Sequence, residues 1–205
     1  MIEPNLFPEY VNVEFQFDKN YYEETVFEKI SFPKLQLNDI EFYNCVFNGV
    51  VLINASFNSC RFEKCSFKNS DLSVSKVINS SFLDVKFENC KLIGIDWTKI
   101  CQPVKVDFLK CKINDSIFTG MDLRSIEIIS CEARNLDFEK TNLSKAKLTD
   151  TDLLNTTFSN TNLSFVDFTD AKNYRIDPTK NNIRKAKFSL PDAIALLDQW
   201  DIEIK

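Results

Sequence analysis

The 205-residue sequence contains no histidine, only 3 glycines and only 2 methionines. Without histidine, the chain lacks the most frequent general base of enzymes and the most frequent side-chain ligand of metal ions. It also has no glycine-rich loop of the kind that cradles phosphates, so nucleotide binding has no support. These absences argue against an enzyme, and they predict no cofactor and no metal site.

Long apolar runs are missing as well. No segment approaches the roughly 18 apolar residues of a membrane span. The start of the chain, MIEPNLFPEY, lacks the basic region and apolar core of a secretory signal. The 7 cysteines show no CxxC spacing, so we expect reduced thiols in a cytoplasmic protein. A net charge of -5 argues against direct nucleic-acid binding, which usually needs a basic patch.

A large apolar residue returns at every fifth position through most of the chain. In the stretch DLLNTTFSNTNLSFVDF, these positions are Leu153, Phe158, Leu163 and Phe168. A helix face repeats at about 3.6 residues and a strand face at 2, so neither explains a period of five. The register holds over 17–97, slips by one residue within 98–107, and holds again over 108–168.

A second column of small residues lies two positions before these large centres. Six of the 7 cysteines fall in it, the exception being Cys101. Each five-residue unit therefore points one large and one small side chain inward. The 3 glycines, Gly49, Gly94 and Gly120, lie two positions after a centre, where we expect a turn.

The segments SNTNL, NTTF and TGMDL follow the A(D/N)Lxx motif of pentapeptide-repeat proteins, which the chain resembles over about residues 15–170. The resemblance implies an all-β fold, a right-handed quadrilateral parallel β-helix in which four units form one coil. Successive coils would pair through their backbones about 4.8 Å apart. We expect an N-terminal cap over 1–16, the β-helix over 17–170 with a register shift at 98–107, and a C-terminal capping and dimerisation segment over 171–205.

The register fails after Asp170, and FSLPDAIALLDQWDIEIK predicts a short C-terminal α-helix. Ser189 can cap this helix, and Pro191 suits its first turn. Apolar residues at helical spacing then form one stripe, part of which should seal the last coil. Quinolone-resistance members of the family end similarly, which implies a homodimer; a monomeric cap is the alternative. The candidate dimer interface is Leu190, Ile194, Leu197, Trp200 and Ile202.

The segment SIEIISCEARNLDF is similar to a stretch in the quinolone-resistance members. This resemblance implies a non-enzymatic DNA mimic that binds a type II topoisomerase, either DNA gyrase or topoisomerase IV, and inhibits it or protects it from quinolones. An acidic stripe would steer a basic DNA-binding surface onto the rod. The candidate topoisomerase-facing residues are Asp107, Glu127, Asp150, Asp167 and Asp170, whose negative charge is partly offset by Lys110 and Lys147 on the same face.

The alternative function is a generic scaffold for another protein. Val51, Ile53, Val74 and Ile93 should all point outward on one side of the rod. A contiguous exposed apolar patch often marks a binding site, although the N-terminal arm is a second candidate to cover it. A continuous negative face would favour the mimic, and a dominant apolar face the scaffold. The 98–107 shift is either a functional loop or a tolerated one-residue insertion.

Overall fold

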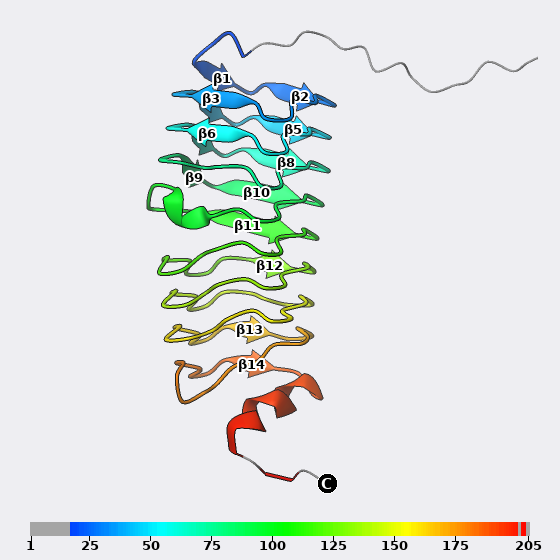
Figure 1. The fold of residues 1–205 in the computed structure, drawn as a ribbon, viewed down its shortest axis with the longest axis vertical. Coiled ribbons are helices and arrows are strands. Elements are labelled where there is room, and N and C mark those ends of the chain that lie inside the picture. Colours follow the sequence, from blue (N-terminus) through cyan, green and yellow to red (C-terminus); the bar gives the residue numbers. More distant parts are fainter. Residues whose placement is uncertain (1–16, 201, 204–205) are drawn as a thin grey trace, which may run out of the picture.

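The computed structural model describes residues 17–200 and 202–203 and shows a rod of stacked coils (Figure 1). Each coil has four short sides, and successive coils pair in parallel with an offset of 20 residues, so that Tyr22 lies opposite Phe42. The predicted quadrilateral parallel β-helix is confirmed. The predicted N-terminal cap lies outside the described residues. We name the sides by the centres that they stack: face A (Phe42, Phe62), face B (Phe47, Phe67), face C (Leu52, Leu72) and face D (Phe57, Val77).

Short parallel strands line three of these faces (Figure 1). Face A holds β1 (Tyr21–Glu23), β4 (Glu41–Tyr43), β7 (Arg61–Glu63) and β9 (Ser81–Leu83). Face B holds β2 (Val26–Glu28), β5 (Val46–Asn48), β8 (Ser66–Lys68), β10 (Val85–Glu88), β11 (Val106–Leu109), β12 (Ile128–Ile129), β13 (Asp167–Phe168) and β14 (Lys187–Phe188). Face D holds β3 (Gln36–Asn38) and β6 (Ser56–Asn58), whereas isolated bridges such as Val51 to Asp71 join face C.

The chain turns nearly every corner of the regular coils through a residue with positive φ, two places after the centre. This column runs from Glu24 (φ 47°) to Lys185 (φ 57°) and includes the three glycines, as predicted. Asn, Asp and Gly tolerate this left-handed conformation best, and Asn and Asp fill many of the corners. Val74 (φ 54°) and Phe165 (φ 61°) are the exceptions, because branched and bulky side chains rarely adopt it.

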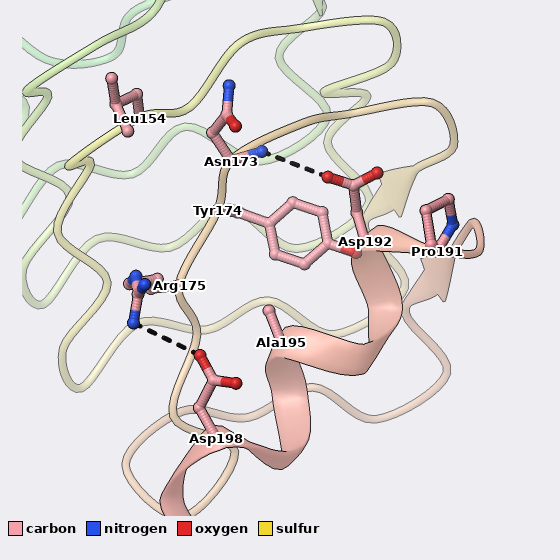
Figure 2. Close-up of a pocket in the computed structure, with 8 residues that line it drawn as sticks. All are labelled: Leu154, Asn173, Tyr174, Arg175, Pro191, Asp192, Ala195 and Asp198. Atoms are coloured by element: carbon pink, nitrogen blue, oxygen red, sulfur yellow. Dashed lines mark hydrogen bonds and ion pairs between the residues drawn. The ribbon is translucent and has the colours of Figure 1, made fainter. Parts of the chain in front are cut away.

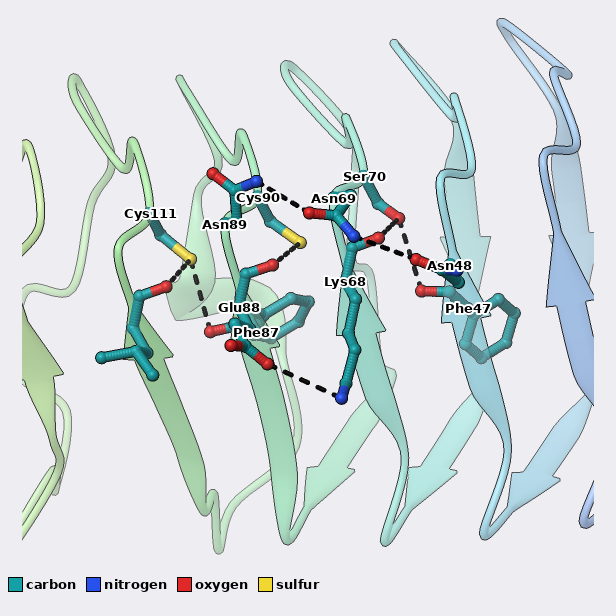
Figure 3. A network of polar contacts seen from close by, with 11 residues as sticks. Phe47, Asn48, Lys68, Asn69, Ser70, Phe87, Glu88, Asn89, Cys90 and Cys111 are labelled. Carbon is teal, nitrogen blue, oxygen red and sulfur yellow. Dashed lines mark hydrogen bonds and ion pairs between the residues drawn. The ribbon is translucent and has the colours of Figure 1, made fainter.

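The interior is a set of stacked side chains with small residues between them. Rings of successive coils lie face to face, as in Phe47 and Phe67, whose centroids are 4.4 Å apart. In the small column, the Ser70 hydroxyl donates to the Lys68 carbonyl at 2.6 Å and the Cys90 thiol to the Glu88 carbonyl at 3.3 Å (Figure 3). Six cysteines are buried and free, and only Cys101 is exposed.

The register shift forms a short loop that opens with the 3-10 helix η1 (Trp97–Lys99). Across the loop, the offset between the two adjoining coils is 21 residues on face B, where Val85 lies opposite Val106. It returns to 20 in the next coil, where Phe108 lies opposite Ile128. Trp97 is buried at this joint, and its ring lies 5.5 Å from that of Phe82 and 5.7 Å from that of Phe108. The side chain therefore links the coils on both sides of the loop.

The end of the rod differs from the sequence-based expectation. Parallel pairing continues past Asp170, because β13 pairs with β14 and Asn162 forms a bridge with Asn182. Tyr174 and Ile176 fill the interior of this coil off the five-residue spacing, which hides it in the sequence. The following helix, η2 (Asp192–Trp200), is a 3-10 helix rather than an α-helix. The Ser189 hydroxyl does not cap it but accepts a hydrogen bond from the Asp170 amide at 3.1 Å.

Candidate interaction surfaces

Three of the candidate topoisomerase-facing residues lie in one column on face B. This column reads Lys86, Asp107, Glu127, Lys147, Asp167 and Lys187 along the rod. Lys147 Nζ lies 2.6 Å from Glu127 Oε1, and Lys187 Nζ lies 3.2 Å from Asp167 Oδ2. Hydrogen bonds from Thr169 and the Lys187 ammonium lower the pKa of Asp167, although partial burial opposes them. The column therefore mixes charges of both signs and is no continuous negative stripe.

Asp107, next to the loop, is half-buried and has a structural role. Its Oδ1 accepts a hydrogen bond from the Glu127 amide at 3.0 Å. Burial raises the pKa of Asp107, while that hydrogen bond and the nearby Lys86 and Lys105 oppose the effect. This carboxylate is therefore less available at the surface than the sequence suggests.

Asp150 and Asp170 form the most exposed acidic pair of the five candidates, at the corner between faces B and C. They lie in successive coils, because the Asp150 amide donates to the Thr169 carbonyl at 3.0 Å. Both side chains are exposed, and neither makes an ion pair with a described residue. This corner therefore carries negative charge that no ion pair among the described residues compensates.

The predicted apolar residues lie together on face C before the loop. Ile53 and Val74 are exposed, whereas Val51 and Ile93 are half-buried. The Val74 amide donates to the Ile93 carbonyl at 2.7 Å, which places these residues in adjacent coils. A methyl group on Gly94 would lie 3.3 Å from Val74 Cγ1, so the valine leans over this glycine.

The C-terminal helix presents a second apolar surface at the end of the rod. All five candidate interface residues are exposed, and Leu190 is the most exposed at 80%. Leu196, not singled out from the sequence, packs against the core instead and attaches the helix to the last coil. The helix thus has one partly buried contact with the core, and the described residues leave its five candidate interface side chains uncovered.

A hollow of about 410 Å³ separates η2 from the last coil (Figure 2). Arg175 Nη1 spans it to Asp198 Oδ2 at 3.4 Å, and the Asn173 amide donates to Asp192 Oδ1 at 3.5 Å. Burial, with a smaller contribution from Asp192, raises the pKa of Tyr174 to about 12. Its hydroxyl has no hydrogen-bond partner among the described residues.

The described part of the chain has neither a cluster of metal-ligating side chains nor a membrane-spanning helix. No group of three or more Cys, Asp or Glu side chains there could hold a metal ion. No helix there has the length and apolar character needed to cross a membrane.

Sequence reasoning missed Phe165, which is exposed at a corner and has Lys185 Nζ 5.4 Å from its ring centroid. A signal was available, since Phe165 falls two places after the centre Leu163. Most other residues at that position are polar or glycine.

Two family models match the sequence on either side of the loop. The model described as pentapeptide repeat region matches residues 40–102, and the one described as pentapeptide repeats (8 copies) matches residues 129–172. The chain belongs to the pentapeptide-repeat family. A comparison of this repeat protein with curated protein sequences finds no match.

Solved structures with a similar fold include QnrB1, described as a plasmid-mediated fluoroquinolone resistance protein. A trypsin-treated variant of QnrB1 superposes with a TM-score of 0.60 at 15% identity, over 90% of this repeat protein and 98% of that chain. Full-length QnrB1 gives a TM-score of 0.49 at 15% identity, over 89% and 100% of the two chains. The likeness establishes a shared fold.

Proposed function

We propose that this pentapeptide-repeat protein is a non-enzymatic, cytoplasmic DNA mimic that binds a type II topoisomerase, DNA gyrase or topoisomerase IV, and protects it from quinolones. The supporting observation is the match in fold and extent with QnrB1, a fluoroquinolone resistance protein, over 90% and 98% of the two chains. Because side chains fill the interior of the rod, its faces are flat, and contacts with a partner protein would be made by surface side chains rather than in a cleft.

The contact surface that we propose is centred on the Asp150 and Asp170 corner, with Asp167, Glu127 and Asp107 beside it. Uncompensated carboxylates attract a basic DNA-binding surface most strongly, because nearby lysines cancel the field of paired ones. Glu127 and Asp167 have such lysine partners, at 2.6 Å and 3.2 Å. The mimicry is therefore local and depends mainly on the two corner aspartates.

We further propose that the protein is a homodimer joined through Leu190, Ile194, Leu197, Trp200 and Ile202. These side chains are exposed on η2 and the residues beside it. Their burial in a symmetric contact would remove a large apolar patch from water.

A supercoiling assay with purified gyrase, with and without a fluoroquinolone, tests the topoisomerase contact. We expect rescue of supercoiling by the wild-type protein and loss of rescue in Asp150→Asn/Asp170→Asn. Asp39→Asn is a matched control, because Asp39 is also a corner residue (φ 56°) but lies far from this surface. Absence of any effect on gyrase and topoisomerase IV at tens-of-micromolar protein would contradict the proposal.

Sedimentation velocity tests the dimer. Ile194→Glu should convert the protein to a monomer, whereas Ile78→Glu should not. The two isoleucines are equally exposed, at 42% and 41%, but Ile78 lies on face D of the rod. A wild-type protein that sediments as a monomer would exclude this interface.

The apolar surface of Val51, Ile53, Val74 and Ile93 supports a second function, a scaffold for another protein. Its specific feature is an exposed branched residue held in a left-handed corner, Val74. Ile53→Glu in the supercoiling assay separates the two functions. Loss of rescue would place the topoisomerase contact on face C, and retained rescue would leave this surface for a different partner.

A further inference from the structure

Beyond the loop, the corner between faces A and B presents cations around an exposed aromatic ring. The Lys145 amide donates to the Ser164 carbonyl at 2.9 Å, and the Phe165 amide donates to the Arg184 carbonyl at 2.9 Å. Lys145, Phe165 and Lys185 therefore lie in successive coils, about 4.8 Å apart along the rod. We call Lys145, Phe165, Arg184 and Lys185 the basic corner.

The positive charge of the basic corner has no free carboxylate to compensate it on face A, and the nearest carboxylates on face B, Glu127 and Asp167, already pair with Lys147 and Lys187. Face A after the loop comprises 122–125, 142–145, 162–165 and 182–185, and Asp122 is the only carboxylate in these segments. Asp122 already pairs with Arg124 at 2.8 Å. Within the described residues, the three cations of the basic corner make no ion pair. A chain with a net charge of -5 thus keeps a local positive patch.

Phe165 is the unusual member of this cluster. It has a φ of 61°, in the region where bulky residues are genuine outliers, and 45% of it is exposed. Corners one coil away on either side hold lysine, which is flexible and polar. Because nearly half of Phe165 remains in water, it gains less from burial than a core phenylalanine does, and a polar residue would avoid the backbone strain. Strain that persists at an exposed position points to a contact with another molecule.

We propose that the basic corner binds an acidic segment of a partner protein that also carries an aromatic or apolar side chain. Carboxylates would pair with Lys145, Arg184 and Lys185, while the apolar side chain covers the Phe165 ring. Nucleic acid is the less suitable ligand, because its affinity grows with the number of phosphates neutralised and only three free cations are present. This site lies on a different corner from Asp150 and Asp170 and goes beyond the proposed function.

Fluorescence anisotropy with the full-length protein tests the basic corner. The probe is a short fluorescein-labelled peptide of alternating glutamate and tyrosine. Lys145→Glu/Lys185→Glu should weaken its binding about tenfold or more, through reversed charge at the contact. Lys29→Glu/Lys110→Glu is the matched control, because both lysines are exposed corner residues on another edge of the rod (φ 53° and 52°).

Phe165→Asn separates a binding role from a structural one. Asparagine suits the left-handed corner, so this variant should unfold at a higher temperature than the wild-type protein and yet bind the peptide more weakly. Unchanged peptide affinity in Phe165→Asn would overturn the proposal, as would no binding by the wild-type protein. Equal binding of a glutamine and tyrosine peptide, or tighter binding of a single-stranded oligonucleotide, would also overturn it.

Discussion

The coils before and after the 98–107 loop build the same geometry from different cores. Before the loop, phenylalanine rings stack along faces A and B, with centroids such as Phe42 and Phe62 at 4.9 Å. After the loop, leucine and isoleucine occupy most centres. The stacked aromatic rings of this half lie mainly on face D, where the ring centroids of Phe118 and Phe138 are 5.2 Å apart. The backbone hydrogen bonds are alike in both halves, at 2.9 Å for Arg61 to Ile40 and for Lys147 to Ile126. The backbone hydrogen bonds between coils therefore determine the coil geometry, and the central side chains only need to fill the interior.

The two halves differ on the surface as well. Face C before the loop exposes Ile53 and half-buries Ile93 beside one ion pair, in which Lys91 lies 3.7 Å from Asp71. After the loop this face has two closer pairs, Lys112 with Glu132 at 2.7 Å and Arg134 with Asp152 at 2.6 Å. Face A begins with Glu23 and Glu24 and ends with the basic corner. Because one rigid rod keeps these patches apart, each can be tested without disturbing the others.

Removal of the side chain that joins the halves should have the largest effect. Trp97→Ala should cost about 3–5 kcal/mol, because it empties a large buried volume between the two cores. Since coils are stabilised only by their neighbours, we expect two unfolding transitions in urea instead of one. Phe138→Ala, within the second half, should cost a similar amount but keep one transition.

Trp97→Phe is a second, milder variant for the case in which Trp97→Ala does not fold, because phenylalanine keeps an aromatic ring at this position. A single transition in both Trp97 variants would show that the backbone ladder alone couples the halves.

An exchange of phenylalanine and leucine between central positions of the two halves should have the next largest effect on the free energy of unfolding. Phe47 stacks on Phe27 at 4.7 Å and on Phe67 at 4.4 Å, and each stacked pair contributes about 0.5–1.5 kcal/mol beyond burial. Phe47→Leu should therefore cost about 1–3 kcal/mol. Leu148→Phe, at the corresponding face B position after the loop, should cost about as much by overpacking a fully buried site. Equal or higher stability of either variant by urea unfolding would show that the cores are interchangeable.

Much of the fold could be predicted from the sequence because one period governs it. Each coil repeats the same inward pair, so the centres from Tyr22 to Phe168 follow from spacing alone. The last coil could not be found this way, since Tyr174 and Ile176 fill it off the spacing. The 3-10 geometry of η2 was equally hidden, because apolar spacing does not distinguish it from an α-helix over so few turns.

The candidate surfaces could be predicted only in part. Outward positions follow from the period, which placed Ile53 and Val74 on one face. Charge compensation depends on which residue lies one coil away, and the one-residue shift at the loop changes those neighbours. The sequence placed Lys147 beside these acidic residues, but it did not reveal the pairing of Asp167 with Lys187, because position 187 lies in the last coil, where the five-residue spacing is lost.

Substitutions at the corner residues should change the free energy of unfolding by a smaller amount, with opposite signs in the two halves. Val74 before the loop and Asn155 after it occupy the same corner column, with φ of 54° and 58°. Left-handed backbone costs a branched residue roughly 1–2 kcal/mol. Val74→Asn should thus raise the free energy of unfolding by about 1 kcal/mol, and Asn155→Val should lower it by at least as much. Destabilisation by Val74→Asn would mean that its apolar contacts outweigh the strain.

The smallest effect should come from a surface ion pair of the second half, and it should depend on pH. The hydrogen bond from Lys112 is the main cause that lowers the pKa of Glu132 below its usual 4.5. A carboxyl group with a lowered folded-state pKa adds stability above its unfolded-state pKa and loses it as the pH falls through the folded-state value. Glu132→Gln should therefore lower the unfolding free energy at neutral pH by less than about 1 kcal/mol, since water screens the pair.

At about pH 3 this difference between Glu132→Gln and the wild-type protein should shrink, because the wild-type carboxyl group becomes protonated as well. Glu41→Gln is the matched control from the first half, since Glu41 is exposed and makes no ion pair with any described residue. Its stability should match that of the wild-type protein at neutral pH. Urea unfolding of all three proteins at both pH values provides the comparison. An equal loss at both would show that Glu132 acts through packing of its side chain rather than through its charge.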